Sequence, residues 1–304
     1  MPSENSILKP GDQIGIIAPS GSFEKTRLVH ALEYFKKAGY KIKLGKHIYK
    51  RDRYLAGSAQ ERADDIHDMF RTKSIKSIFA ARGGFGATQV LPLLDYKLIQ
   101  NNPKPLFGFS DTTALQLALW EKSKLSTISG LALCADISKN GFNEYTKKYF
   151  EDFINTSQIA PIQLKSQKLH SPIRGKLIGG CLTLVVALSG TNYQPQFKDR
   201  ILFLEDVKEE PYRIDRLLTQ LSQQNNFNRL KAIIFGKFFE CKSENPKYGT
   251  IEKVLQEFAD LHQIPVFTNL PYGHQPDRCQ VTIGQNVTID QKSVLRFEPF
   301  QWKS

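Results

Sequence analysis

The sequence predicts an α/β protein with a mostly parallel β-sheet in its N-terminal half, and two observations support this prediction. Short apolar runs that are typical of buried strands, such as IGIIA and SIKSIFAA, alternate with segments whose apolar residues recur at helical spacing. The chain has 304 residues, of which 40% are hydrophobic and 24% are charged, so it is long enough for two globular domains. We expect helices on both faces of the N-terminal sheet and a second, smaller α/β domain.

The N-terminal half consists of strand and helix patterns in succession. The strand DQIGIIA precedes a helix that has Leu28, Ala31 and Phe35 on one face. Ser58 and Glu61 form a capping box at the start of the next helix, which leads to the strand SIKSIFAA. The glycine-rich turn ARGGFGA, a further helix and the strand and helix of PLFGFSDTTALQLALW follow. These patterns predict an N-terminal domain over residues 1–150.

A linker and a second domain are predicted in the remainder of the chain. Residues 151–175 are rich in proline, serine and lysine and show little amphipathic periodicity, which indicates a linker. Further on, GGCLTLVVALSG reads as a buried helix, and RILFLED, AIIFGKF and IPVFTNL read as strands. The tail after Gln280 alternates in short segments like a terminal hairpin. We therefore expect the second α/β domain over residues 176–304.

Composition and charge exclude several classes of protein. The N-terminus lacks the apolar stretch of a signal peptide, and no apolar run approaches the roughly 18 residues of a membrane span. The formal net charge is +12, but the cations are dispersed, and the densest cluster, in GKHIYKRDRY, matches no nucleic-acid-binding motif. We expect a cytoplasmic protein with neither a membrane nor a nucleic-acid partner. A small acidic substrate remains compatible with the charge.

The four cysteines are too widely spaced for a metal or disulfide framework. No CxxC pair occurs, which argues against a zinc site and against a disulfide-stabilised scaffold. We expect buried free thiols at Cys134, Cys181, Cys241 and Cys279.

Ser110 lies at the junction between the strand and the helix of PLFGFSDTTALQLALW. A side chain at such a turn projects from the carboxyl edge of the sheet, where open α/β proteins bind ligands. The N–H of Asp111 at the helix start could then stabilise an oxyanion formed by attack of Ser110 on a carbonyl. The alternative is that Ser110 is an N-cap, a position that serine also favours. The motif is not G-x-S-x-G, because residue 112 is threonine.

The turn ARGGFG directly follows a predicted strand. Its glycines allow positive φ angles and close backbone approach, so the amides of Gly83 and Gly84 can face an anion or a developing oxyanion. Arg82 is a candidate cationic partner for a substrate carboxylate. The alternative is a turn that is structural only.

A carboxylate and an imidazole occupy similar positions in the second half of the chain. Glu205 ends the strand RILFLED at the carboxyl edge, although a solvated strand end is the alternative. Arg213 on the following helix is either a surface charge or a substrate clamp. Of the six histidines, only His274 lies in a Pro/Gly-flanked loop after a strand, where it is either catalytic or solvated. The chain order Ser, Glu, His matches one order of acyl-transfer triads.

Six segments together resemble a known family. They are GDQIGIIAPSG, ARGGFGATQVLPLLDY, FGFSDTTAL, GGCLTLV, LFLEDVKEEPYRIDRLLTQL and PYGHQPDRCQVTIG, and they resemble the LD-carboxypeptidase family of serine peptidases. The resemblance implies a nucleophile at Ser110, catalytic partners at Glu205 and His274, and oxyanion donors at Asp111 and in the RGG turn, where we place Gly84. It also implies a flavodoxin-like N-terminal domain, a smaller C-terminal domain with the glutamate and histidine, and a homodimer.

The implied reaction is hydrolysis of the bond between a diamino acid and the terminal D-alanine of a murein tetrapeptide. The diamino acid is meso-diaminopimelate or lysine, the context is cell-wall recycling, and no metal or cofactor is required. Two alternatives are a microcin C immunity peptidase, which cuts an amide in a peptidyl-nucleotide antibiotic, and a non-catalytic anion-binding protein. The sequence departs from the family at Phe85 and Phe109, where tyrosine is frequent, and at SGLA from Ser129, where His-Gly-Pro is frequent. The last departure concerns the substrate pocket.

Overall fold

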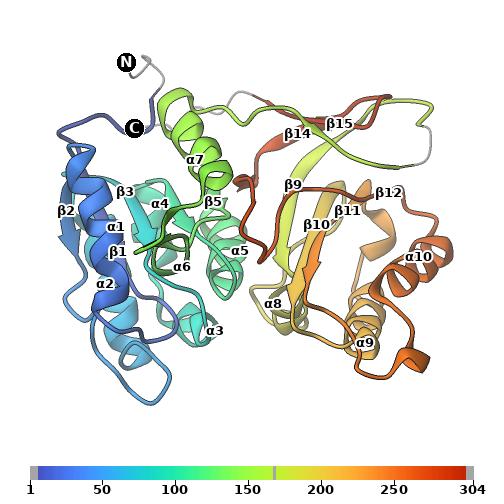
Figure 1. Ribbon diagram of the computed structural model, residues 1–304, viewed down its shortest axis with the longest axis horizontal. Helices are drawn as coiled ribbons and strands as arrows, with labels where there is room; N and C mark the ends of the chain where they lie inside the picture. Colours follow the sequence, from blue (N-terminus) through green and yellow to red (C-terminus); the bar gives the residue numbers. More distant parts are fainter. Residues whose placement is uncertain (1–5, 167–168, 299–304) are drawn as a thin grey trace. The chain divides into compact units, whose positions relative to one another are not determined.

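The apolar runs of the N-terminal half form neighbouring strands of one six-stranded sheet. The computed structural model describes residues 6–166 and 169–298. The strands of the first sheet are β1 (Gln13–Ile17), β2 (Lys41–Leu44), β3 (Ile75–Ala80), β4 (Leu106–Gly108), β5 (Thr127–Ser129) and β13 (Val281–Ile283) (Figure 1). They are ordered β2-β1-β3-β4-β5-β13, and all pairs are parallel except β5 with β13. The order 2-1-3-4-5 of the parallel strands is that of flavodoxin, so the fold predicted for this half is confirmed.

The chain forms two units, as the predicted two-domain α/β class requires. The first unit contains the described residues up to 159 and residues 279–284. The second unit contains the described residues of 160–278 and of 285–298. β13 therefore belongs to the first unit although it lies late in the chain. The terminal hairpin predicted after Gln280 is formed by the antiparallel strands Asn286–Ile289 and Val294–Phe297. The prediction did not anticipate β13, which precedes this hairpin and pairs with β5 instead.

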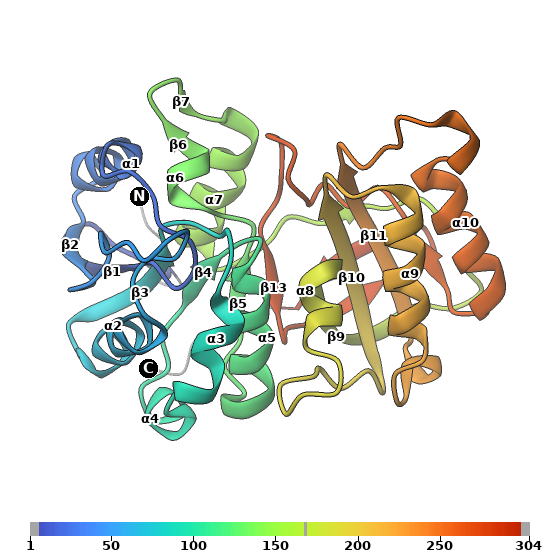
Figure 2. The same ribbon diagram turned by 90° about the horizontal axis from the view of Figure 1, so that it is seen from below.

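Helices cover both faces of the first sheet, as predicted (Figure 2). The helices of this unit are α1 (Thr26–Lys37), α2 (Ala59–Arg71), α3 (Ala87–Val90), η1 (Leu91–Leu93), α4 (Tyr96–Asn101), α5 (Thr112–Ser123), α6 (Leu133–Asp136) and α7 (Glu144–Thr156), with a small ladder of β6 (Ile137–Ser138) and β7 (Gly141–Phe142). Ser58 caps α2 in the predicted capping box with Glu61.

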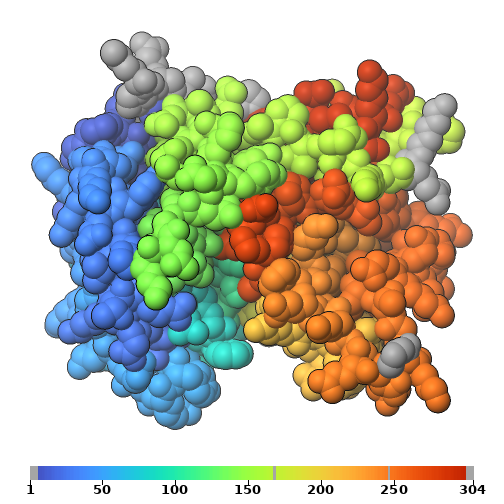
Figure 3. Space-filling model, viewed as in Figure 1, coloured from blue at the N-terminus to red at the C-terminus, as the bar shows by residue number. Residues whose placement is uncertain are grey.

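Aromatic side chains fill the layer between the sheet and helices α1 and α7. The ring of Phe35 on α1 lies 5.0 Å from that of Phe79 on β3, and the ring of Phe150 on α7 lies 5.8 Å from that of Phe107 on β4. These side chains are fully buried. In the space-filling view α1 and α7 cover this face of the sheet (Figure 3).

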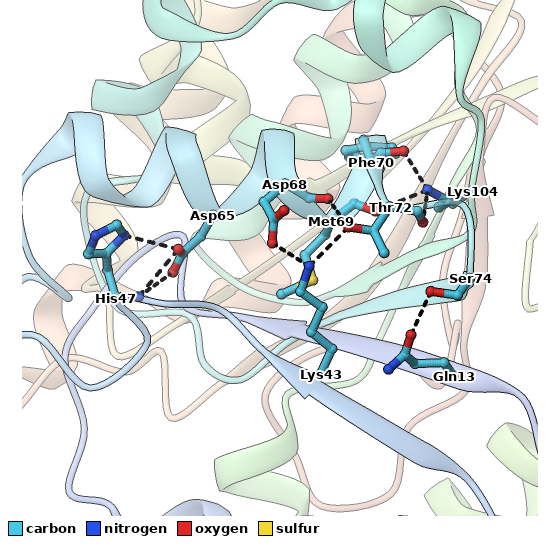
Figure 4. A network of polar contacts seen from close by, with 10 residues as sticks. All are labelled: Gln13, Lys43, His47, Asp65, Asp68, Met69, Phe70, Thr72, Ser74 and Lys104. Atoms are coloured by element: carbon cyan, nitrogen blue, oxygen red, sulfur yellow. Dashed lines mark hydrogen bonds and ion pairs between the residues drawn. The ribbon is translucent and has the colours of Figure 1, made fainter.

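A hydrogen-bonded pair and an ion pair fix one side of helix α2, which packs on the opposite face of the sheet (Figure 4). The carboxylate of Asp65 accepts a hydrogen bond from the backbone N–H of His47 (3.0 Å), and its Oδ1 lies 3.0 Å from the imidazole Nδ1. The Lys43 ammonium on β2 lies 2.7 Å from the carboxylate of Asp68. Helix α2 is thereby tied to β2 and to the turn that follows it.

A buried ammonium group closes the C-terminal end of α2. Lys104 is only 8% exposed, and its Nζ donates hydrogen bonds to the carbonyl oxygens of Met69 (3.0 Å), Phe70 and Thr72 (2.8 Å) (Figure 4). The last carbonyl groups of a helix have no partner within the helix. Lys104 supplies that partner from the segment that leads into β4.

Replacing Lys104 by methionine should destabilise the first unit by about 1–3 kcal/mol, because buried carbonyl groups lose their donor. Burial lowers the pKa of Lys104 from 10.5 to about 8. Between these two values the unfolded chain binds more protons at this lysine than the folded chain does, so the free energy of unfolding rises with pH in the wild type. We expect the difference in melting temperature between wild type and Lys104→Met to widen from below pH 8 to near pH 10.5. A constant difference would contradict the lowered pKa.

The second unit contains a mixed sheet of seven strands. These are β8 (Ile162–Gln163), β9 (Ile173–Cys181), β10 (Arg200–Val207), β11 (Ala232–Phe239), β12 (Val266–Phe267), β14 (Asn286–Ile289) and β15 (Val294–Phe297), in the order β12-β11-β10-β9-β14-β15-β8. The helices are α8 (Leu182–Ala187), α9 (Pro211–Ser222), η2 (Phe227–Arg229), η3 (Pro246–Tyr248) and α10 (Ile251–His262). Strands β9 to β12 are parallel, whereas β14, β15 and β8 add antiparallel pairs.

Two segments of this region differ from the sequence-based expectation. GGCLTLVVALSG was expected to be one buried helix, but its first three residues end β9 and only Leu182–Ala187 are helical. The segment 151–175, expected as a linker, contains the last residues of α7, strand β8 and the first residues of β9. Residues 167 and 168 of this segment lie outside the described residues.

Two expectations from composition can be compared with the structure. All four cysteines are buried and free, as predicted. Within residues 6–166 and 169–298, every helix falls short of the length and apolarity that a membrane crossing requires.

Candidate active site

Three turns of the first unit meet at the carboxyl edge of its sheet. The turns follow strands β1, β3 and β4. These strands are parallel, and β3 lies between β1 and β4. The chain leaves β1 and β3 towards opposite sides of the sheet, and this is where open α/β sheets bind ligands. Gly21 in the first turn donates its N–H to the carbonyl oxygen of Gly83 in the second (3.1 Å), and Ser110 lies in the third. The predicted nucleophile and the predicted glycine turn are thus brought together.

Ser110 has a left-handed backbone conformation, with a φ angle of 63°. Such a conformation costs a residue other than glycine about 1–2 kcal/mol, and it recurs where a functional side chain must be presented. The alternative role as N-cap does not hold, because Asp111 occupies the N-cap position of α5 and makes no capping hydrogen bond with its side chain. The carbonyl oxygen of Ser110 accepts the N–H of Thr113 (2.8 Å), which fixes the turn to the helix.

The glycine turn touches the backbone around Ser110. A Cβ atom added to Gly83 would lie 2.9 Å from the Cβ of Ser110, 3.0 Å from the carbonyl oxygen of Phe109 and 3.2 Å from the amide nitrogen of Asp111. Side chains do not fit at such distances, so residue 83 must be glycine for the two turns to meet. Gly84 follows with a φ angle of 105°. The amides of Asp111 and Gly84 are therefore the candidate donors to an oxyanion formed at Ser110.

Replacing Gly83 by alanine should lower kcat by about a hundredfold, because the added methyl group must push the glycine turn away from Ser110. Gly175→Ala is the matched control, since its added Cβ would lie 3.1 Å from the carbonyl oxygen of Asp199 in the other unit. We expect the control to lose stability and to keep most of its activity. Wild-type kcat in Gly83→Ala would show that the contact with Ser110 has no catalytic role.

The two arginines proposed as substrate-binding residues already have partners in the structure. Arg82 donates a hydrogen bond to the carbonyl oxygen of Ser22, in the turn after β1. Arg213 lies on α9 in the second unit, where its guanidinium is 3.4 Å from the carboxylate of Glu209 and its Nε donates to the hydroxyl of Tyr212 (3.1 Å). Arg213 therefore belongs to a surface ion pair, whereas Arg82 lies beside the glycine turn.

Glu205 and His274 form a hydrogen-bonded pair in the second unit. Oε2 of Glu205 lies 2.7 Å from Nδ1 of His274. Glu205 is 0% exposed, and the side chain of His274 is 18% exposed, so neither is the solvated residue of the alternative interpretation. With a proton on Nδ1 shared with the carboxylate, Nε2 is the basic nitrogen of the ring. Burial raises the pKa of Glu205, and the hydrogen bond from His274 opposes this effect.

Strand β11 holds both members of the pair in place. The register between β10 and β11 shifts at Glu205, an irregularity that often re-aims a side chain beside a functional site. A Cβ atom added to Gly236 on β11 would lie 2.4 Å from the carbonyl oxygen of Tyr272 and 3.4 Å from the Cβ of Glu205. The N–H of Lys237 donates to the same carbonyl oxygen (2.8 Å). The loop that carries His274 is thus fixed to the strand next to Glu205.

Two carboxylates in these regions accept hydrogen bonds from residues at the starts of helices that are distant in the sequence. The sequence did not predict these contacts. Asp206 accepts hydrogen bonds from the N–H (2.9 Å) and the hydroxyl (2.7 Å) of Thr183, in the first turn of α8. Asp111 accepts the N–H of Ala87 (2.8 Å), at the start of α3. An acidic residue facing a helix start is a favourable pairing, but it is invisible when the two lie far apart in sequence.

The structure thus assembles two sets of the predicted residues. Arg82, Gly83, Gly84, Ser110 and Asp111 lie together in the first unit, and Glu205 with His274 in the second.

Comparison with known proteins identifies both halves of the chain. Residues 14–130 match a family described as the LD-carboxypeptidase N-terminal domain, and residues 174–289 match the LD-carboxypeptidase C-terminal domain. These matches cover more than half of the chain and follow the two units in order.

Individual relatives match over nearly their whole length. A probable murein peptide carboxypeptidase of Bacillus subtilis is 31% identical over 290 residues, which are 93% of this chain and 90% of the relative. The microcin C7 self-immunity protein MccF of Escherichia coli is 30% identical over 321 residues, 93% of this chain and 92% of the relative. The crystal structure of muramoyltetrapeptide carboxypeptidase from Oxalobacter formigenes has a TM-score of 0.86 at 25% identity, covering 96% of this chain and 100% of that one.

Proposed function

Since this chain belongs to the LD-carboxypeptidase family of serine peptidases, we propose that it removes the terminal D-alanine from a murein tetrapeptide. The observation that supports the proposal most directly is the buried hydrogen bond between Glu205 and His274, 2.7 Å long. A carboxylate that orients an imidazole in this way is the arrangement that activates a serine in acyl transfer. Ser110, on its left-handed turn, is the residue that this pair activates.

In the proposed reaction Ser110 Oγ attacks the carbonyl carbon of the bond before the D-alanine. Nε2 of His274 takes the hydroxyl proton and later gives it to the leaving amine. The N–H groups of Asp111 and Gly84 stabilise the oxyanion. Glu205 keeps the proton of the imidazole on Nδ1 and stabilises the charged ring. Water then attacks the ester at Ser110, with the same histidine as base, and the shortened peptide leaves.

The substrate side of the proposal concerns a diamino acid followed by D-alanine. The relative in Bacillus subtilis is named for murein peptides and the enzyme of Oxalobacter formigenes for the muramoyl tetrapeptide. Gly83, Arg82 and Arg213 are the proposed partners of the substrate's carboxylates. The net charge of +12 favours such an anionic peptide. We further propose that the protein acts in the recycling of murein peptides, that it is cytoplasmic and that it forms a homodimer. Light scattering of the purified protein tests the homodimer.

Incubation of the purified protein with murein tetrapeptides tests the reaction. One peptide contains meso-diaminopimelate and the other lysine. Mass spectrometry should show a tripeptide and free D-alanine, and the faster peptide identifies the preferred diamino acid. Both tetrapeptides remaining intact would contradict the proposed substrate.

A second candidate reaction is cleavage of the amide in a peptidyl nucleotide. It is favoured by the 30% identity to the microcin C7 self-immunity protein over 93% of this chain. An aminoacyl sulfamoyl adenosine offered beside the tetrapeptide separates the two reactions by their kcat/KM values. Binding without turnover of either compound would instead indicate an anion-binding protein.

A further inference from the structure

We propose that Arg62 is a positioning residue, which with the carboxylate of Asp111 clamps one peptide group of the glycine turn and so holds the turn against Ser110. The effect on catalysis rests on the proposed function, whereas the clamp itself is a property of the first unit.

Arg62 is a buried cation directed at the turns of the carboxyl edge. It lies in the first part of α2 and is only 1% exposed. Its Nη1 donates to the carbonyl oxygens of Pro19 (2.8 Å) and Gly86 (2.7 Å), and its Nη2 donates to Oε1 of Gln89 (2.7 Å). Charged side chains are almost never this buried unless their donors are satisfied. Arg62 therefore joins the turn after β1 to the turn after β3.

Asp111 completes the clamp from the opposite side of the same peptide group. The carbonyl oxygen of Gly86 and the N–H of Ala87 belong to one peptide unit. Arg62 binds the oxygen (2.7 Å), and the Asp111 carboxylate accepts the N–H (2.8 Å). Hydrogen bonds to ionised partners are about twice as strong as neutral ones. A rotation of this peptide group would break both bonds and so remove one hydrogen-bond partner from each of the two buried charges.

The charges of the clamp balance each other across the turn. Burial lowers the pKa of Arg62, and the negative charge of Asp111 opposes this effect. Burial raises the pKa of Asp111, and hydrogen bonding to Ala87 and the charge of Arg62 oppose it. Each charge therefore stabilises the other in the interior, with the turn between them.

A glycine turn needs such a clamp if its amides are to act as oxyanion donors. Gly84 and Gly86 have φ angles of 105° and 109°, and glycine has no side chain to restrict its backbone. Donors to an oxyanion are effective when they are fixed before the reaction starts. Asp111 has two roles in this arrangement. Its backbone N–H is one proposed oxyanion donor, and its carboxylate holds the glycine turn that contains the other proposed donor, Gly84. Arg62 acts on catalysis only through this turn.

Arg62→Lys tests the proposal, because a lysine ammonium keeps the charge but cannot reproduce the fork of the guanidinium. We expect kcat to fall by about ten- to a hundredfold, with KM changed by less than about threefold, because the lost interaction stabilises only the transition state. Hydrogen exchange of the amides of residues 83–87 should become faster in the absence of substrate.

Lys104→Met is the matched control, since it removes another buried cation that binds carbonyl groups at the far end of the same helix. It should lower the melting temperature while kcat stays within about twofold of wild type and exchange at residues 83–87 stays unchanged. An equal loss of kcat in both variants would overturn the proposal in favour of general destabilisation.

Gln89→Ala is the milder variant, for use if Arg62→Lys does not fold. Gln89 is exposed, and its replacement removes one acceptor of the guanidinium without stranding a charge. We expect kcat to fall by about two- to fivefold, with faster exchange at residues 83–87. Wild-type kcat and exchange in this variant would overturn the clamp. Faster exchange in a protein that leaves every tetrapeptide intact would support the clamp and contradict only the proposed reaction.

Discussion

Replacing Ser110 by alanine should reduce kcat for tetrapeptide cleavage by about a thousandfold to a millionfold, the largest effect that we predict. The alanine variant has no atom that can attack the carbonyl carbon, although the oxyanion donors and the substrate contacts remain. Substrate affinity should therefore change little. Single-turnover kinetics measure the rate, and calorimetric titration with the tetrapeptide measures the affinity. Activity that survives this change would show that the nucleophile lies elsewhere.

The backbone of Ser110 adds a second measurement to this prediction. At a φ angle of 63° alanine retains the steric cost of the left-handed conformation, whereas glycine does not. Ser110→Gly should therefore be more stable than Ser110→Ala by about 1 kcal/mol, and both should be inactive. Chemical denaturation of the two variants measures the difference. If alanine were the more stable, the turn would not be strained in the protein in solution.

Glu205→Gln should lower kcat by about ten-thousandfold while preserving the shape of the buried pair. The amide has no charge to stabilise the imidazolium, and its NH₂ group can donate to Nδ1 of His274, which moves the ring proton to the wrong nitrogen. The same assay measures the loss. Asp206→Asn is the control, because this neighbouring buried carboxylate holds Thr183 instead of the histidine. It should reduce stability and affect kcat far less. Equal losses in the two variants would remove the special role of Glu205.

The pH dependence of stability should distinguish wild type from Glu205→Gln. Burial raises the pKa of Glu205 above its ordinary value of 4.5. At pH values between 4.5 and the raised pKa of the folded state, the folded chain binds more protons at Glu205 than the unfolded chain does. The free energy of unfolding of the wild type therefore falls as the pH rises through this range. Glutamine has no such dependence. Thermal unfolding at acidic and at neutral pH should show the variant gaining relative to wild type at neutral pH.

Local sequence patterns predicted the elements that depend on local interactions. The capping box of Ser58 and Glu61 belongs to this group. The alternation of strand and helix patterns also predicted a mostly parallel first sheet, whereas its flavodoxin-like fold was implied only by the family resemblance. The patterns failed where pairing is distant. Strand β13 pairs with β5, about 150 residues earlier, and no local signal distinguishes this from a hairpin. A short apolar run such as GGCLTL also does not separate the end of a buried strand from the start of a buried helix.

The candidate site was predictable to the extent that it lies at strand ends. Ser110 lies shortly after the parallel strand β4 and Glu205 lies near the end of the parallel strand β10, positions that residue type and apolar runs reveal. Glu205 and His274 are 69 residues apart in the sequence, and only the folded structure brings them into contact. Arg62 was not predictable, because an arginine on an amphipathic helix normally faces solvent. Its burial depends on carbonyl groups that two distant turns supply.

The late position of β13 in the chain also determines the order in which the protein can be assembled during synthesis. The five parallel strands of the first sheet leave the ribosome by residue 129, but the outer edge of β5 has no partner strand until residues 281–283 emerge. An uncovered strand edge pairs readily with other chains. The nascent protein therefore carries an open edge on β5, the neighbour of β4, while almost all of the second unit is translated. A truncated product that stops before residue 279 would keep that edge and should be prone to aggregation.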